Sequence, residues 1–139
     1  NYKQNLMKIY FATSIRGSAD NNIDTAELIS KLKNFGQVLT EHFSSIKAEG
    51  ETDLTDKEIH DRDLRWIDEC DVIVAEVTNP SLGVGYEIRY GIETGKRILC
   101  LKHNNGKRLS AMVSGCEYVE LEMYEDTADI DDILSDFFD

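Results

Sequence analysis

A short loop that runs into a glutamate is the part of this chain best suited to chemistry. Residues 78–87 read TNPSLGVGYE, so Ser81, Gly83 and Gly85 stand directly ahead of Glu87. Glycines permit a tight turn and a close approach of the backbone to a ligand. If a helix begins here, its first N–H groups and its dipole favour a bound anion, and Ser81 adds a hydroxyl donor. The alternative is that the glycines serve only a tight strand-to-helix connection.

Glu87 is expected in the first turn of that helix. There the helix dipole favours the ionised form of a carboxyl group, which suits a nucleophile and not a proton donor. Acidic residues also stabilise helix N-termini without taking part in any reaction. Glu87 is therefore a candidate nucleophile, and a helix-capping charge is the alternative.

A second carboxylate comes from residues 55–71, where apolar residues recur at helical spacing. Asp63 falls four residues after Ile59 and three before Trp66, so it shares their inward face. An aspartate on a buried face is costly unless it is paired or used, although it can also cap a backbone. Two carboxylates in one pocket, one ionised and one with a raised pKa, are typical of glycosidic-bond cleavage. The charged neighbours expected to point mostly elsewhere are Asp61, Arg62, Arg65 and Asp68.

An earlier loop, TSIRGS at residues 13–18, supplies Ser14, Arg16 and Gly17. An arginine beside a serine and a glycine can clamp a phosphate. Tyr10 lies on the strand before this loop, where its ring belongs to the core or its hydroxyl reaches the site. The three histidines show no metal-ligand spacing, so we expect neither a metal nor an organic cofactor.

The elements that must position these residues alternate between strand and helix patterns. Strands are expected at 8–13, 37–43, 72–77, 97–102 and within 116–124, and helices at 24–36, 55–71, 84–95 and 127–139. Asp24 with Glu27 and Thr55 with Glu58 are the predicted capping boxes, and Gly36 is the predicted end of the first helix. A loop with at most one helical turn is expected at 103–115.

This alternation predicts one α/β domain over residues 1–139, with residues 1–7 as a candidate loose extension. The expected architecture is a doubly wound, five-stranded parallel sheet, flavodoxin-like or Rossmann-like. In such sheets the ligand lies beyond the carboxyl ends of the strands, where the winding direction switches. The loops that follow the first and third strands are therefore the predicted site.

Composition narrows the classes of partner. The chain is 41% hydrophobic and 30% charged with one proline, and its net charge is -12, which argues against a nucleic-acid surface. A small phosphorylated ligand is compatible with that charge. Cys70, Cys100 and Cys116 are interpreted as reduced core residues. No run is apolar enough to cross a membrane and no signal region begins the sequence, so a cytoplasmic protein is expected, nuclear as well in a eukaryote.

Four runs together resemble a known family: KIYFATSIRGS, HDRDLRWIDECDVIVAEVTNPSLGVGYEI, GKRILCL and RLSAMVSG. They look like the 2'-deoxynucleoside 5'-phosphate N-hydrolases (Rcl type) of the nucleoside 2-deoxyribosyltransferase superfamily, from about Lys8 to Gly115. The resemblance implies cleavage of the N-glycosidic bond of deoxynucleoside monophosphates, which yields a free base and 2-deoxyribose 5-phosphate. It further implies a homodimer with a shared active site.

The resemblance also implies roles for individual residues. Glu87 matches the nucleophile that forms a glycosyl-enzyme ester, Asp63 the carboxylate that assists base departure and then water, and Tyr10 a tyrosine at the sugar. Residues implied at the phosphate or elsewhere on the substrate are Ser14, Ile15, Arg16, Gly17, Ser81, Gly83 and Met112, together with Ser110 from the partner subunit.

Ser81 favours a nucleotide over a nucleoside as substrate. Transferases of this superfamily carry an acidic residue at that place, and a carboxylate there would repel a phosphate dianion. Departures from the family pattern are Thr13 and Ser18 near the phosphate loop, and Arg89. The alternatives are a deoxyribosyltransferase, a ribonucleotide (CMP-type) N-glycosidase, and a non-catalytic module that binds FMN or another nucleotide.

Overall fold

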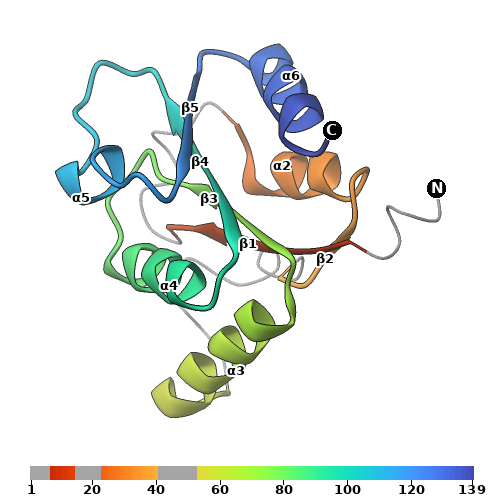
Figure 1. The fold of residues 1–139 in the computed structure, drawn as a ribbon, viewed down its shortest axis with the longest axis vertical. Helices are drawn as coiled ribbons and strands as arrows, with labels where there is room; N and C mark the ends of the chain where they lie inside the picture. Colours follow the sequence, from red (N-terminus) through yellow and green to blue (C-terminus); the bar gives the residue numbers. More distant parts are fainter. Residues whose placement is uncertain (1–6, 15–22, 41–52) are drawn as a thin grey trace.

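The computed structural model describes residues 7–14, 23–40 and 53–139, which form a five-stranded sheet flanked by helices (Figure 1). The strands are β1 (Lys8–Thr13), β2 (Gln37–Val38), β3 (Val72–Glu76), β4 (Arg97–His103) and β5 (Glu120–Tyr124). All of them run parallel, in the order β2-β1-β3-β4-β5. This is the flavodoxin-like order of doubly wound sheets, so the predicted fold class is confirmed.

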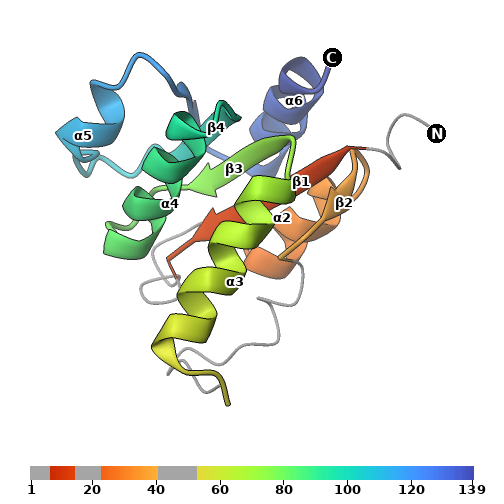
Figure 2. The ribbon, with the colours of Figure 1, turned by 60° about the horizontal axis from the view of Figure 1, so that its bottom comes forward.

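The helices lie on both faces of the sheet (Figure 2). They are α2 (Thr25–Leu32), α3 (Asp56–Glu69), α4 (Leu82–Glu93), the short α5 (Ala111–Ser114) and α6 (Thr127–Phe137). Helices α2 and α6 pack on one face of the sheet, and α3 and α4 pack on the other. The winding direction therefore switches between β1 and β3, because the chain moves outward from these two strands in opposite directions.

Burial on both faces of the sheet explains the apolar sequence of the central strand β3. All five of its residues are buried, and successive side chains enter opposite cores. Val72 and Val74 join the core beneath α2 and α6, whereas Ile73 and Ala75 join the core beneath α3 and α4. A strand covered on both faces reads as a continuous apolar run and not as an alternating one.

The two predicted capping boxes have different outcomes. In α3 the Thr55 hydroxyl accepts from the Glu58 N–H at 3.2 Å and the Glu58 carboxylate accepts from the Thr55 N–H at 3.1 Å, so this box is confirmed. In α2 the N-cap is Asp24, but its side chain makes no capping hydrogen bond, so the box with Glu27 is wrong.

Helix α2 also ends at Leu32 and not at Gly36. Gly36 has a different task, because a Cβ atom there would lie 2.5 Å from the Met7 carbonyl oxygen. The next residue, Gln37, donates its N–H to that same oxygen at 2.8 Å and so begins the pairing of β2 with β1. Gly36 therefore allows two backbones to approach, which is the second common use of glycine.

Strand β2 is shorter than the predicted 37–43, and residues 41–43 lie outside the described part of the chain. A side chain replaces the backbone ladder beyond Val38. The buried Thr40 hydroxyl accepts from the Phe11 N–H at 3.1 Å and donates to the Phe11 carbonyl oxygen at 2.8 Å. Both backbone groups of Phe11 on this edge are thus satisfied without a further strand residue.

The cysteines mostly follow expectation. All three are free thiols, and Cys70 and Cys100 are buried. Burial raises the pKa of the Cys70 thiol to about 11 and that of Cys100 to about 12. Cys116 is only half-buried, so the prediction of a core position is wrong for this residue.

Among the described helices, none combines the length and the apolar character that a bilayer span requires.

Gly91 sets how closely α4 lies on the sheet. A Cβ atom at Gly91 would come within 2.2 Å of the Ile73 Cδ1 atom and 3.3 Å of the Ile98 Cδ1 atom, both in the core. We expect Gly91→Ala to lower the free energy of unfolding by about 1–3 kcal/mol, because overpacking a dense core outweighs the better helix propensity of alanine. Urea unfolding measures this change.

Gly85 is the matched control, since it lies in the same helix and a Cβ there would meet nothing within 4 Å. Gly85→Ala is expected to leave stability unchanged or to raise it by up to about 1 kcal/mol. Equal stabilities for the two variants would show that α4 does not pack on β3 this closely.

Candidate active site

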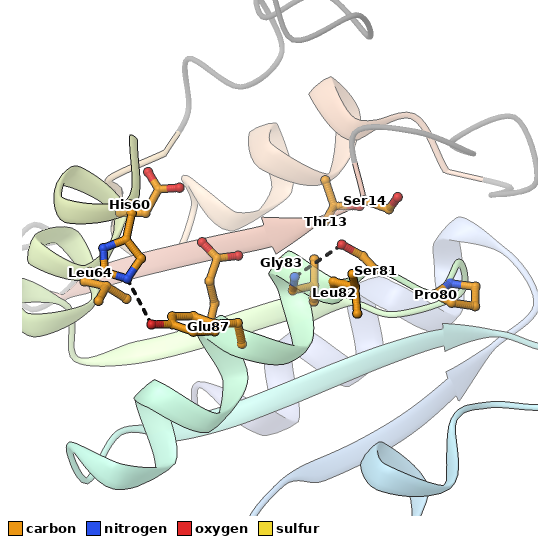
Figure 3. Close-up of a pocket in the computed structure, with 12 residues that line it drawn as sticks. Thr13, Ser14, His60, Leu64, Pro80, Ser81, Leu82, Gly83 and Glu87 are labelled. Carbon is orange, nitrogen blue, oxygen red and sulfur yellow. Dashed lines mark hydrogen bonds between the residues drawn. The ribbon is translucent and has the colours of Figure 1, made fainter. Parts of the chain in front are cut away.

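A cavity of about 600 Å³ opens at the carboxyl ends of β1 and β3, beside α3 and the start of α4 (Figure 3). This is the switch point of the sheet, where the sequence predicted a site. Its lining residues are Thr13, Ser14, His60, Asp63, Leu64, Pro80, Ser81, Leu82, Gly83, Val84, Tyr86 and Glu87. Five of the predicted site residues are thus brought together at this cavity: Ser14, Asp63, Ser81, Gly83 and Glu87.

Glu87 lies in the second turn of α4, because the helix begins at Leu82 and its first turn contains no acidic residue. The predicted place in the first turn is therefore wrong. The predicted ionisation is wrong in direction as well, since the pKa of Glu87 is raised from 4.5 to about 7. Burial is the largest cause and the neighbouring Asp63 adds to it, whereas a hydrogen bond from Tyr10 and the charge of Arg62 act in the opposite direction.

Tyr10 unites the two roles that its sequence position left open. Its ring is fully buried beneath α3 and α4, and its hydroxyl donates to Oε2 of Glu87. Burial and the charge of Glu87 raise the pKa of Tyr10 well above its ordinary value, so the hydroxyl remains protonated and remains a donor. Tyr10 is not among the residues that line the cavity, and it orients the Glu87 carboxylate from the core.

Asp63 faces the cavity from α3, as its helical spacing predicted. Its side chain is 15% exposed and is held by Arg62, whose Nε and Nη2 atoms lie 3.1 and 3.0 Å from Oδ1 of Asp63. Residues adjacent on a helix ordinarily diverge, so Arg62 was expected to point away from Asp63. Its contact with Asp63 shows that this expectation is wrong. Trp66, four residues after Arg62, was the available signal, and its ring centroid lies 4.7 Å from the guanidinium carbon.

The cavity has a polar end. Ser81 is the N-cap of α4, and its hydroxyl accepts from the Val84 N–H at 3.2 Å while keeping a hydrogen to donate. Gly83 and Ser14 lie at this same end (Figure 3). The first N–H groups of a helix point outward without intrahelical partners, so this end suits an anion.

The opposite end is aromatic and was missed by the sequence analysis. His60 and Leu64 lie there, on the far side of Glu87 from Ser81 (Figure 3). Nε2 of His60 lies 2.9 Å from the Tyr86 hydroxyl and the two rings meet edge to face at 5.5 Å, so the pair bridges α3 and α4. Glu87 thus stands between a polar end that suits an anion and an aromatic end that suits a planar ring.

The remaining predicted residues are not part of this cavity in the described chain. Ser110 is the N-cap of α5, and Met112 is on that helix; both line a second cavity, of about 340 Å³, between α4 and α5. The two cavities adjoin, since they share lining residues at the start of α4. Ile15, Arg16 and Gly17 lie outside the described residues. Within the described ranges, no three His, Cys, Asp or Glu side chains are grouped to hold a metal ion.

Glu87 should make the protein less stable as the pH rises. Its folded pKa of about 7 exceeds the ordinary value of 4.5, so between these pH values the folded state holds a proton that the unfolded state has released. Stability is then lost progressively from about pH 4.5 through pH 7, by about 3 kcal/mol in total. Glu87→Gln is expected to raise the free energy of unfolding more at pH 8 than at pH 5, as measured by urea titration. Equal changes at both pH values would contradict burial as the cause.

Known families match this chain over most of its length. The family model described as nucleoside 2-deoxyribosyltransferase matches residues 9–128. The 5-hydroxymethyl-dUMP N-hydrolase of Danio rerio is 45% identical over 138 residues, 96% of each chain. A Nematostella vectensis protein, named provisionally as a 2'-deoxynucleoside 5'-phosphate N-hydrolase 1, is 43% identical over 139 residues, 94% of this chain and 93% of that one.

A solved structure shares the fold. The CMP N-glycosidase BcmB of Clostridium botulinum superposes with a TM-score of 0.67 over 94% of this chain and 98% of its own, at 18% identity. At that identity the likeness supports the fold alone. The family resemblance read from the sequence motifs is confirmed by the family model and by the relatives.

Proposed function

The chain belongs to the nucleoside 2-deoxyribosyltransferase family, and on that premise we propose that it hydrolyses the N-glycosidic bond of 2'-deoxynucleoside 5'-monophosphates. The products are the free nucleobase and 2-deoxyribose 5-phosphate. The observation that carries this proposal is the order of groups in the cavity: an end at Ser81 that suits an anion, a half-buried carboxylate at Glu87, and an aromatic end at His60. A nucleotide has the same order of phosphate, sugar and base.

The proposed first step is attack by the Glu87 carboxylate on the anomeric carbon. A new C–O bond forms as the C–N bond breaks, and the bonding electrons leave with the base, which takes up a proton. A water molecule then attacks the same carbon, releases Glu87 and gives up a proton. Asp63 lines the same cavity and is the group proposed to deliver the first proton and accept the second.

The surroundings of Glu87 suit this role. A carboxylate with a pKa of about 7 is more basic than an ordinary one, so its ionised form is the stronger nucleophile. The Tyr10 hydroxyl leaves Glu87 with one oxygen oriented and the other available for attack. This gain has a limit, since a growing fraction of Glu87 is protonated below about pH 7.

Ser81 is proposed to select the phosphate group. A serine hydroxyl donates to a phosphate dianion, whereas a carboxylate at this place would repel it. This supports a nucleotide as the substrate and favours water over a second base as the acceptor.

The direct test is chromatography of a reaction with deoxy- and ribonucleoside monophosphates, free deoxynucleosides, and a deoxynucleoside with a second free base. Base release from deoxynucleoside monophosphates is the expected result. Exchange of one base for another would identify a transferase, and release from CMP would identify a ribonucleotide N-glycosidase. Tight binding of a monophosphate with no turnover would leave a nucleotide-binding module.

We also propose that two copies of the chain assemble with a shared active site. Leu82 and Met112 are 97% and 85% exposed, beside the second cavity that adjoins the first. Large apolar side chains exposed together typically mark an interface. Ser110 lies in that second cavity, so a partner seated there would bring its own Ser110 toward the polar end of the neighbouring site.

Sedimentation equilibrium and subunit complementation test this assembly. A dimer is expected, and Leu82→Glu should dissociate it. Mixing inactive Ser110→Asp with inactive Glu87→Gln should restore about a quarter of the wild-type activity, because half of the dimers are then mixed and each has one intact site. A monomeric wild type, or no recovery on mixing, would reject the shared site.

A further inference from the structure

Arg62 is a cation placed against Asp63, one of the two carboxylates of the cavity. Both of its contacts to Asp63 end on the same oxygen, at 3.1 Å from Nε and 3.0 Å from Nη2. The Arg62 side chain is only 18% exposed, and its guanidinium carbon lies over the Trp66 ring, 4.7 Å from the ring centroid. Arg62 is therefore held on two sides, by an ion pair and by a cation–π contact along its own helix.

The two carboxylates of the cavity repel each other, and Arg62 is the cation beside one of them, Asp63. Asp63 and Glu87 line one cavity, and two like charges in a partly buried space oppose each other's ionisation. The titratable and charged groups around Glu87 are Tyr10 from β1 and Asp63, Arg62 and His60 from α3, with Tyr86 beside it on α4. Asp63 raises the pKa of Glu87, and Arg62 is the group on α3 whose charge lowers it.

We propose that Arg62 is a positioning residue of this site, which presents the Asp63 carboxyl group to the cavity and supplies the counter-charge that favours the ionised form of Glu87. The inference rests on the proposed role of Glu87 as the nucleophile. Arginine suits this task better than lysine, because its planar fork directs two N–H groups at one carboxylate while its face stacks on an aromatic ring.

A purely structural role explains this arrangement less well. The Arg62 and Asp63 side chains are 18% and 15% exposed, and in such a largely buried pair the cost of desolvating both charges offsets their attraction. The charge of Arg62 also acts on Glu87 across a partly buried site, where it is less screened than in water. An ion pair with a structural role alone would leave the ionisation of Glu87 unchanged, so the titration of Glu87 separates the two roles.

The test compares Arg62→Gln with Arg65→Gln, since Arg65 is an exposed arginine on the same helix. Loss of the positive charge at position 62 is expected to raise the pKa of Glu87 further. The acid limb of the kcat/KM profile should then move to higher pH by about half a unit to one unit in Arg62→Gln. Arg65→Gln should leave the limb in place. Arg62→Lys keeps the positive charge, so its limb should shift less than that of Arg62→Gln.

A second readout needs no substrate. Carbon-13 NMR of glutamate-labelled protein follows the carboxyl titrations, and the Glu87 signal is the one missing from Glu87→Gln. Its midpoint should move upward in Arg62→Gln and stay fixed in Arg65→Gln. An unmoved midpoint in Arg62→Gln overturns the inference even if the wild type releases base. Conversely, the midpoint could move in Arg62→Gln while the wild type releases no base. That result would uphold the counter-charge and reject the proposed function.

Discussion

Glu87→Gln is expected to lower kcat for base release from deoxynucleoside monophosphates by at least about 10⁴-fold, since removing a covalent nucleophile abolishes the step on which the others depend. The amide retains the size and the contact with Tyr10 but cannot attack the anomeric carbon. KM should change little, because the phosphate-binding end at Ser81 is unaltered. Steady-state release of base, followed by chromatography, measures both parameters.

Glu93→Gln is the matched control, as an exposed glutamate on the same helix α4 whose partner is Arg89. It should retain wild-type kcat. An acid quench of the wild-type reaction, followed by peptide mass spectrometry, should find 2-deoxyribose 5-phosphate attached to the peptide that contains Glu87. If Glu87→Gln retains substantial activity, Glu87 is a structural charge and the covalent mechanism is rejected.

Ser81→Asp is expected to reduce kcat/KM for deoxynucleoside monophosphates by about 10²–10³-fold, because a like charge placed beside the phosphate costs several kcal/mol. The helix should survive the change, since aspartate is as good an N-cap as serine and Ser81 caps α4. The activity toward free deoxynucleosides should stay constant or rise. Kinetics with each nucleotide and its matching nucleoside measure this switch.

Ser81→Asn separates charge from shape. Asparagine has the size of aspartate, also caps helices and carries no charge. It should retain most of the activity that Ser81→Asp loses. Equal losses in the two variants would mean that this end of the cavity limits size and does not recognise a phosphate.

Local patterns were sufficient to predict most of the fold. The apolar run at β3 and the capping box of α3 depend on neighbours in sequence, and both are confirmed. The parallel sheet follows from strands that alternate with helices, because each crossover returns the chain in the same direction. The ends of α2 and β2 could not be predicted in this way, because they depend on contacts with β1 and the residue before it. Gly36 packs against the Met7 backbone, and Thr40 hydrogen-bonds to the Phe11 backbone.

The candidate site was predictable as a set of residues but not as an electrostatic system. Helical spacing placed Asp63 on the inward face of α3, and the topology rule placed Ser81 at the switch point. His60 and Tyr86 were missed because each is an ordinary helix residue until α3 and α4 pack together and bring the two rings into contact. A pairing between two helices leaves no periodic signal in either one.

The sequence by itself determined the fold class, the family and the two carboxylates, because periodicity, turn residues and motif spacing are properties of neighbouring positions. Only the tertiary structure decided the chemical state of those carboxylates. A dipole argument from sequence predicted an ionised Glu87, whereas burial and the neighbouring Asp63 raise its pKa to about 7. Desolvation depends on everything that surrounds a group in space, and that environment exists only once β1, α3 and α4 are assembled.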